Sequence, residues 1–230
     1  EAHGLYDPAN EHDACGVGFV CNIKNVKSRR IVEQGLELLV RLTHRGAVGA
    51  DPRAGDGAGI LVQIPDTFFR ASVGFELPPA GSYGVGMVFL PQDAACRQEM
   101  VETIERNLTQ GGQQVLGWRD VPVDNSVLGE SVIPTEPVTR QVFVACGDNC
   151  PDQDAFERKL FVVRKRMDNA IRAAGHAKTA YYVTSMSSRT ITYKGMLLAD
   201  QVGAYFRDLQ DPRFASALAL VHQRFSTNTF

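Results

Sequence analysis

The sequence lacks the features of a membrane-embedded or secreted protein. None of its apolar runs approaches the roughly 20 residues that are needed to cross a bilayer. The first segment, EAHGLYDPANEHDA, is polar and has no apolar centre of the kind found in secretory signals. Cysteines are few and odd in number, five in 230 residues, which favours reduced thiols over a disulfide framework. We therefore expect a cytoplasmic protein with no membrane partner.

An excess of one charge sign is also missing. The formal net charge is -2, and the densest basic cluster is KNVKSRR (24–30), which is typical of a solvated loop that leads into a helix. Proteins that bind nucleic acids rely on clustered Lys and Arg to contact phosphates. We therefore expect no nucleic-acid partner.

Two segments come close to known ligand-binding motifs but lack the residues that would complete them. RAGDGAG (53–59) is not followed by Lys-Ser/Thr, and it precedes a strand pattern rather than the helix of a dinucleotide turn. CGDNC (146–150) places two thiols four residues apart, with no second Cys or His pair nearby to complete a tetrahedral metal site. A turn is the favoured interpretation of CGDNC, and we expect no cofactor or metal site in this chain.

Strand and helix patterns alternate along the chain without a fixed repeat or a low-complexity linker, which predicts a single mixed domain. Adjacent strand patterns favour antiparallel sheets that are covered by helices, an α+β class. Helix patterns cover 28–46, 93–112 and 152–175, with a shorter helix after 197. Strand patterns cover 16–23, 60–65, 82–91, 113–123 and 138–146, and 180–197 alternates like a hairpin.

The same patterns predict which side chains are buried. The strand at 16–23 is apolar enough to be buried, and Cys21 and Cys96 are expected in the core. Helical spacing in 28–46 selects Val32, Leu36, Leu39, Val40 and Thr43. In 152–175 it selects Phe156, Leu160, Val163, Met167 and Ile171.

Three side chains are candidates for chemistry on local grounds. His44 and His222 could act as bases, but a lone histidine near an apolar element is more often a structural hydrogen-bonding group. Cys15 could be an ordinary core residue or a nucleophile. Its thiol, with a pKa of roughly 8.5, needs a base, and if the chain began at Cys15 its own α-amine, with a pKa of roughly 7.7–8.0, would supply one. Gly16 would leave room for the substrate.

Four segments carry a family resemblance that extends over essentially the whole chain. LYDPANEHDACGVGFV, LTHRGAVGADPRAGDGAGILVQIPDTFFR, SMSSRTITYKGML and LVHQRFSTNTF together resemble the N-terminal glutaminase region of glutamate synthase large subunits. That region is a class II, N-terminal-nucleophile glutamine amidotransferase. The resemblance implies a four-layer αββα sandwich, incomplete in this chain, with residues 1–14 as a propeptide and 15–230 as the N-terminal part of the amidotransferase domain.

The resemblance also implies roles for individual residues. Cys15 matches the nucleophile that removal of the propeptide exposes. Arg224 matches the arginine that binds the α-carboxylate of glutamine, a group that a guanidinium can bind in a bidentate manner. Thr227 and Asn228 follow in the segment that lies beside bound glutamine, although several relatives carry histidine where Asn228 stands. Arg45 and Gly46 match the Arg-Gly pair that lines the nucleophile's pocket, where Arg45 either contacts substrate or braces the loop.

The implied reaction is hydrolysis of L-glutamine to glutamate and ammonia, with ammonia passed to a downstream synthase domain that acts on 2-oxoglutarate. FMN and an iron–sulfur cluster (3Fe-4S) are implied in the full-length enzyme, outside these residues. A small subunit or ferredoxin would donate electrons, in the cytoplasm or, in a photosynthetic eukaryote, in a plastid. Two alternatives stay open: another class II amidotransferase, and a non-catalytic glutamine-binding module or unprocessed precursor.

One element of the family site is missing from the sequence. The class builds its oxyanion hole from an Asn-Gly pair that lies C-terminal to the segment RFSTNT, and Asn-Gly does not occur in these 230 residues. Loss of an oxyanion donor typically lowers turnover by about 10²–10³-fold. We therefore expect residues 1–230 alone to be inactive.

Overall fold

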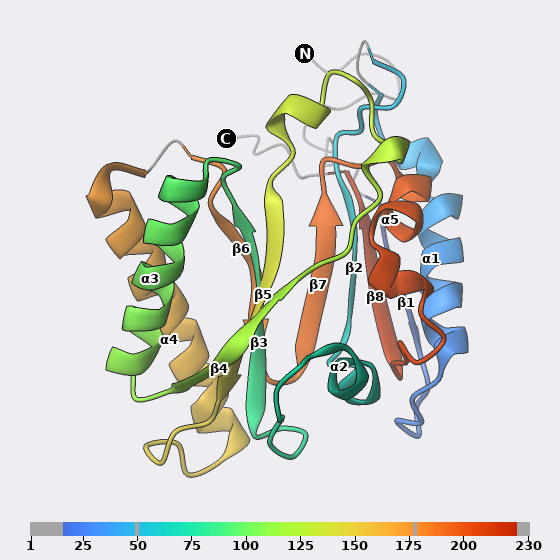
Figure 1. Cartoon of the computed structure of the whole chain (residues 1–230). Coiled ribbons are helices and arrows are strands. Elements are labelled where there is room, and N and C mark those ends of the chain that lie inside the picture. Colours follow the sequence, from blue (N-terminus) through green and yellow to red (C-terminus); the bar gives the residue numbers. More distant parts are fainter. Residues whose placement is uncertain (1–15, 49–50, 177–178, 225–230) are drawn as a thin grey trace, which may run out of the picture.

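Two antiparallel sheets form the centre of the molecule. In this computed structural model, residues 16–48, 51–176 and 179–224 are described, and they form two four-stranded sheets with the orders β1-β8-β2-β7 and β4-β5-β3-β6 (Figure 1). The strands of the first sheet are β1 (Gly16–Cys21), β8 (Leu218–Gln223), β2 (Ala58–Gln63) and β7 (Thr190–Gly195). Those of the second are β4 (Gln114–Asp120), β5 (Val138–Ala145), β3 (Tyr83–Leu90) and β6 (Tyr182–Ser187).

Helices flank the sheets on opposite sides of the molecule. The pair α3 and α4 lies on one side, and α1 and α5 lie on the other, with the strands between them (Figure 1). The helices are α1 (Arg29–Arg41), α2 (Asp66–Ser72), α3 (Ala94–Gln110), α4 (Gln153–Ile171) and α5 (Ala199–Tyr205), with short turns η2 (Thr43–Arg45), η3 (Asn125–Val127), η4 (Ile133–Thr135), η5 (Arg172–His176) and η6 (Arg207–Gln210). The predicted α+β class with helix-covered antiparallel sheets is confirmed, while the complete αββα sandwich stays a prediction.

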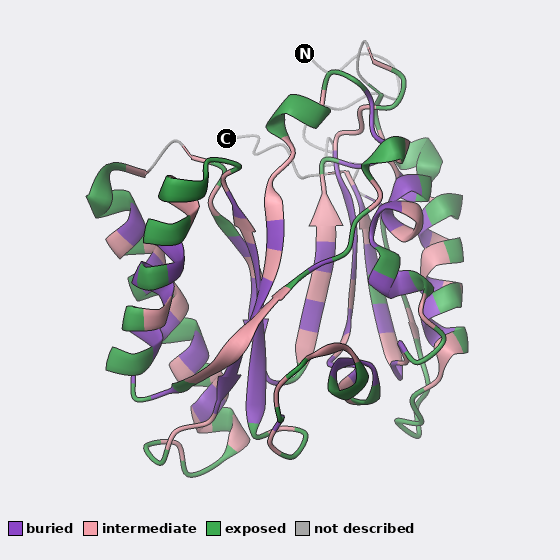
Figure 2. Ribbon diagram, in the orientation of Figure 1, coloured by how far each residue is buried: buried purple, intermediate pink, exposed green. Residues whose placement is uncertain are grey.

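The helix α4 agrees closely with its sequence pattern. Asp152 caps it by accepting a hydrogen bond from the backbone N–H of Ala155 at 2.7 Å, as an N-cap aspartate does. The buried face lies against β6 and β3 and packs against α3; buried residues of the helices are purple in Figure 2. All five predicted residues are buried: Phe156, Leu160, Val163, Met167 and Ile171. Helical spacing was sufficient here because one face of a long helix is fully covered.

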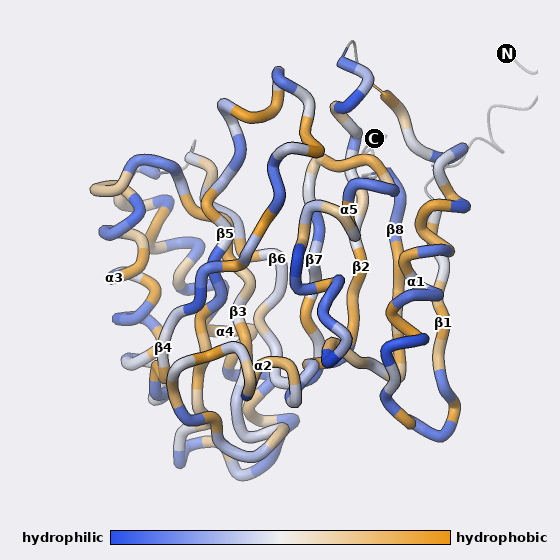
Figure 3. The backbone as a smooth tube through the Cα atoms, turned by 45° about the vertical axis from the view of Figure 1, so that its right-hand side comes forward, coloured by the Kyte–Doolittle hydropathy of each residue, from blue (hydrophilic) through white to orange (hydrophobic). Residues whose placement is uncertain are grey.

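The helix α1 is shorter than predicted and rotated relative to the expected face. It ends at Arg41, and the segment that follows forms the tight turn η2. Val32 and Leu39 are buried as predicted, but Val40 is 46% exposed, so its assignment to the core was wrong. Gly35 faces the sheet instead, where a side chain would collide with Ala219. The alternation of hydrophobic and hydrophilic residues along α1 is visible in Figure 3.

The strand β1 is covered on one face only. Gly18 lies close to Leu38 of α1, whereas Val17 and Phe19 point to the opposite face and are 60% and 67% exposed. Cys21 shares that face and is exposed, so the predictions of a buried strand and a core Cys21 were wrong. Cys96 is half-buried against the α3–α4 core, which agrees in part with its prediction.

The segment 180–197 contains the two predicted strands, but they do not pair as a hairpin ladder. β6 pairs with β3 and β7 pairs with β2, so consecutive strands belong to different sheets. Hydroxyl groups of β6 bond instead to the backbone of β7. Thr192 N–H donates to Ser185 Oγ at 3.0 Å, and Thr184 Oγ1 donates to the carbonyl of Thr192 at 3.0 Å. These side-chain bonds satisfy part of the edge of β7 at the corner between the sheets.

A buried polar network joins the two sheets. The guanidinium of Arg119 on β4 donates two bonds to Asp208 of η6, at 2.7 and 2.8 Å. The hydroxyl of Tyr193 on β7 also donates to Asp208, at 2.8 Å, and accepts from Gln141 of β5 at 3.0 Å. Burial raises the pKa of Tyr193 well above its ordinary value, and the adjacent Asp208 raises it further, so its proton stays in place. The network fixes how the sheets meet.

Candidate functional site

The candidate site lies where β8 ends between the first residues of β1 and β2. Gly16 at the start of β1 pairs with Gln223 at the end of β8, and Gln223 also pairs with Ala58 at the start of β2. We call this place the three-strand junction and include in it the adjoining residues Asp56, Gly57 and Arg224. The antiparallel register therefore brings together three segments that are distant in the sequence. Ala58 and Gln223 are 165 positions apart, and Gly16 and Gln223 are 207 positions apart.

The Arg-Gly pair after α1 lies against the junction. The turn is held by a bond from the N–H of Arg45 to the carbonyl of Leu42 at 2.8 Å. The side chain of Arg45 passes so near Gly16 that a Cβ there would lie 3.0 Å from its own Cβ. Gly46 packs directly on the side-chain amide of Gln223 and leaves no room for a Cβ. Both residues therefore line the start of β1, although Arg45 itself is largely exposed.

Arg224 lies at the junction in an unusual backbone conformation. Its φ angle is 72°, in the left-handed region that non-glycine residues seldom adopt. Its backbone N–H donates to the carbonyl of Gly57 at 2.7 Å, which continues the pairing of β8 with β2 by one residue. Its side chain is 38% exposed, and its Nε lies 3.4 Å from Oδ2 of Asp56. The predicted carboxylate-binding arginine is thus held next to Gly16 and the Arg45–Gly46 turn by two neighbouring contacts.

Two further polar residues of the junction were not selected from the sequence. Gln223 is 1% exposed, and its Oε1 has no hydrogen-bond partner among the described residues. Both carboxylate oxygens of Asp56 are buried and likewise lack a hydrogen bond within the described part of the chain. Unpaired buried acceptors cost free energy, so they mark a place where a donor belongs. The signal for Gln223 was present in ALALVHQ, where a glutamine occupies an inward position of an alternating strand.

Three predicted site residues lie outside the described residues. They are Cys15, Thr227 and Asn228. Gly16, which follows Cys15, opens β1, and Arg224 directly follows β8, the strand that pairs with β1. The roles of the three residues therefore stay predictions.

The two candidate histidines differ in their surroundings. His44 is exposed in η2, where its Nδ1 lies 3.1 Å from the carbonyl of Arg41. His222 lies on β8, paired with Gly59 and Val17. Burial lowers the pKa of His222, the charge of Lys194 lowers it further, and Asp56 offsets part of the effect. The imidazole of His222 is therefore neutral near pH 7.

Other polar clusters are located away from the junction. Cys96 Sγ lies 3.5 Å from Nδ1 of His176, whose Nε2 lies 3.1 Å from Glu99. Because the two ring nitrogens face opposite ways, this chain of contacts has no common point for a metal ion. Within residues 16–48, 51–176 and 179–224, no group of three or more His, Cys, Asp or Glu side chains could hold a metal ion.

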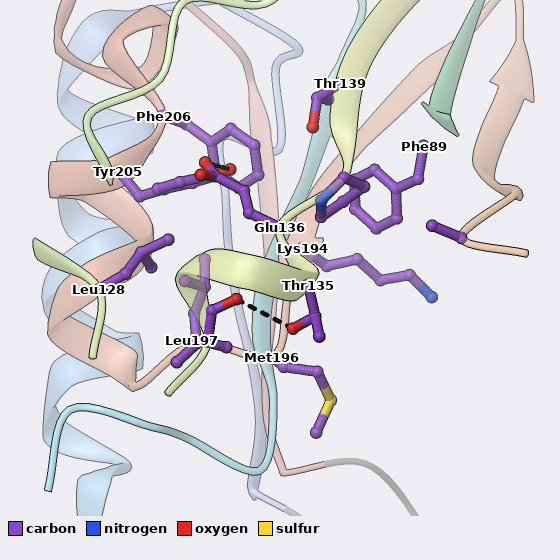
Figure 4. A pocket seen from close by; sticks show the side chains of 14 residues that line it. Phe89, Leu128, Thr135, Glu136, Thr139, Lys194, Met196, Leu197, Tyr205 and Phe206 are labelled. Carbon is purple, nitrogen blue, oxygen red and sulfur yellow. Dashed lines mark hydrogen bonds between the residues drawn. The ribbon is translucent and has the colours of Figure 1, made fainter. Parts of the chain in front are cut away.

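A cavity of about 270 Å³ lies at the β7 edge of the first sheet (Figure 4). Two of its polar side chains are bonded: Tyr205 donates to Glu136 at 2.7 Å, and Lys194 donates to the hydroxyl of Tyr182 at 2.9 Å. Oγ1 of Thr139 is buried without a hydrogen-bond partner among the described residues. Its lining is mostly apolar and includes Phe89, Leu128, Leu197 and Phe206. None of the predicted site residues within the described ranges lines it, so this cavity suits an apolar group rather than acid–base chemistry.

No helix in the described part of the chain is both long and apolar enough to pass through a membrane.

Comparison with known proteins gives one family and a consistent set of relatives. The family described as glutamine amidotransferases class-II matches residues 15–230. The glutamate synthase [NADPH] large chain of Bacillus subtilis is 48% identical over 231 residues, and the match covers 100% of this chain but 15% of that protein. The glutamate synthase [NADH] of Schizosaccharomyces pombe is 43% identical, with 100% and 11% covered. The ferredoxin-dependent glutamate synthase 1 of Arabidopsis thaliana is 40% identical, with 98% and 14% covered. The chain thus spans between 11% and 15% of the length of these relatives.

Proposed function

The chain belongs to the class II glutamine amidotransferases, and we propose that its three-strand junction hydrolyses L-glutamine to glutamate and ammonia. The observation that carries the proposal is the convergence of Gly16, the Arg45–Gly46 turn and Arg224. These segments are distant in the sequence, and the resemblance to the amidotransferase family is what assigns roles to Arg45, Gly46 and Arg224. Their proximity supports a carboxylate-binding role for Arg224, because this arginine lies beside the residue that follows the candidate nucleophile.

In the proposed reaction, residues 1–14 are a propeptide whose removal frees the α-amine of Cys15. The amine accepts the thiol proton as sulfur attacks the side-chain amide carbon of glutamine, and the tetrahedral intermediate forms. The same amine returns the proton to the leaving nitrogen, ammonia departs, and a γ-glutamyl thioester remains. Water then attacks the thioester, and glutamate is released with the thiol restored.

Arg224 supplies specificity for the free amino acid in this proposal. A glutamine residue within a protein has no α-carboxylate, so a guanidinium that binds this group discriminates between the two. Its partly exposed side chain at the junction supports this role. Thr227 and Asn228, which follow it by three and four positions, are proposed to contact bound glutamine, and Arg45 and Gly46 to line the pocket.

For the whole protein we propose a glutamate synthase, because the relatives quoted above carry that name. Ammonia would pass to a synthase domain that acts on 2-oxoglutarate, in a fold whose amidotransferase part completes the αββα sandwich. Iron–sulfur clusters are held by several Cys thiolates, and the described residues offer no such cluster of ligands. We propose that FMN, the 3Fe-4S cluster and the contacts with an electron-donating subunit or ferredoxin lie outside these 230 residues, as the family resemblance implies. A reducing compartment, cytoplasm or plastid, fits the thiol chemistry.

A glutamine analogue with a chloroketone in place of the side-chain amide tests the proposal in the full-length protein. It should alkylate Cys15, located by peptide mass spectrometry, and excess L-glutamine should protect the thiol. The rate of L-glutamine hydrolysis should fall in proportion to the fraction of Cys15 that is alkylated. Alkylation confined to other cysteines, or full activity after Cys15 is modified, would contradict the proposed function.

A further inference from the structure

The segment RAGDGAG (53–59) has no place in the reaction described so far, yet two of its residues contact Arg224. Positions 55 and 57 of this segment favour glycine for two different structural reasons. Gly55 passes so close to the backbone of Leu197 that a Cβ would collide with it, and Gly57 has a φ of 124°, which L side chains rarely adopt. Asp56 stands between them. The loop therefore has the geometry to hold a single carboxylate at a fixed position against the end of β8.

The backbone contact fixes where the side chain of Arg224 starts. A non-glycine residue at φ 72° is strained and persists only when its surroundings hold it there. Here the 2.7 Å bond from Arg224 N–H to the carbonyl of Gly57 provides that restraint. Because Gly57 and Asp56 are consecutive, the same loop restrains both the backbone and the side chain of Arg224.

The side-chain contact fixes how the guanidinium is oriented. Asp56 faces Nε of Arg224 at 3.4 Å, and no other ion pair is found for either group among the described residues. A guanidinium donates along separate edges, and contact through Nε leaves the edge formed by its two terminal nitrogens for a second carboxylate. Both oxygens of Asp56 are buried without a hydrogen bond within the described ranges, although the side chain as a whole is 26% exposed. A carboxylate in that condition is costly to retain for stability alone.

We propose that Asp56 is a positioning residue for substrate binding: it holds the guanidinium of Arg224 through Nε, so that the terminal nitrogens face the α-carboxylate of L-glutamine. This inference rests on the proposed glutaminase function and adds to it a determinant of substrate affinity. Asp56 does not contact the substrate itself. Its replacement therefore weakens glutamine binding without slowing the chemical step at the amide.

The test uses steady-state glutamine hydrolysis by the full-length protein. Asp56→Asn should raise KM for L-glutamine about 5- to 30-fold, the range expected when a charged hydrogen-bonding group is misplaced rather than removed, with kcat changed less than about threefold. Asp56→Glu should recover part of the affinity. Asp51→Asn is the matched control, because it removes the same charge from a neighbouring position that bonds Ser131 and Arg53 instead. It should change KM less than about twofold.

Two further arms test whether Asp56 acts through Arg224. In an Arg224→Lys background, Asp56→Asn should add less than about a twofold change, because coupled residues are not additive. The preference for L-glutamine over its α-amide, which lacks the carboxylate, should fall by the same factor as the affinity. An unchanged KM in Asp56→Asn, an equal effect of Asp51→Asn, or a full effect in the Arg224→Lys background would overturn the inference. Absence of glutamine hydrolysis in the unmodified protein would instead contradict the proposed function.

Discussion

The α3–α4 half of the molecule and the three-strand junction differ in how well their apolar faces are packed and their polar groups are bonded. In the α3–α4 half, aspartates cap both helices and the apolar faces are buried against the sheet β4-β5-β3-β6. At the junction, Arg224 is strained, oxygens of Asp56 and Gln223 are buried without a hydrogen bond among the described residues, and Val17 and Phe19 on β1 are exposed. Strain and buried acceptors without a hydrogen bond lower stability, so their presence at the junction supports the proposal that this region binds substrate. Among the described residues of α3 and α4, one such buried group is found, Nε of Arg164.

The largest expected effect is at the nucleophile. In the full-length protein, Cys15→Ser should lower glutamine hydrolysis by at least about 10³-fold, because the hydroxyl is a far weaker nucleophile than the thiolate. Cys21→Ser is the control, since Cys21 is an exposed thiol at the other end of β1. Initial rates of glutamate release measure both. Comparable losses in the two variants would remove the distinction between the junction and the rest of β1.

A change in the α3–α4 half should affect stability and leave kinetics unchanged. Leu160→Ala creates a cavity beneath α4, where the side chain is fully buried, and should lower the free energy of unfolding by about 2–5 kcal/mol. The neighbouring Phe161→Ala serves as control because Phe161 is 59% exposed. Denaturant titration gives the stabilities. If Leu160→Ala also altered KM for glutamine below its unfolding temperature, the two regions would not be independent.

Arg224→Lys should change the kinetics and leave the stability nearly unchanged. Lysine keeps the charge but loses the fork that matches a carboxylate, so KM for L-glutamine should rise about 10- to 100-fold. The midpoint of thermal unfolding should change little, because the side chain is 38% exposed. Parallel measurement of KM and thermal unfolding checks this. Unchanged kinetics would place the carboxylate-binding group elsewhere.

The smallest effect concerns His222 and acid stability. Burial lowers the pKa of His222 below its ordinary value of 6.5, so above that pH the imidazole is neutral in both the folded and the unfolded states. As pH falls through 6.5 toward the lower folded pKa, the unfolded state binds the proton first and stability is lost, with a slope of at most one proton. His222→Gln should flatten this slope in urea titrations between pH 7 and 5. An identical slope in both proteins would rule out His222 as its source.

Local patterns predicted some elements well and missed others for a physical reason. Spacing identified the buried face of α4, and Asp93 and Asp152 mark helix starts because their caps depend on neighbouring residues. Val40 and Cys21 were placed wrongly because periodicity tells which residues share a face, whereas contacts made across the molecule decide which face is covered.

At the candidate site, too, some residues were predicted from the sequence and others were missed. Arg45, Gly46 and Arg224 were predicted from a family resemblance, and the structure brings these three together. Asp56 and Gln223 were missed because their importance lies in a register between β1, β8 and β2 that no single segment contains. The segment at 180–197 was likewise expected to form a hairpin, whereas its two strands joined different sheets.

The most direct test of the proposed mechanism is the N-terminal residue of the active full-length protein, determined by mass spectrometry of its first peptide. That residue should be Cys15, with a free α-amine. A protein that hydrolyses glutamine while the peptide bond between Ala14 and Cys15 is intact would contradict it, because a blocked amine cannot serve as the base.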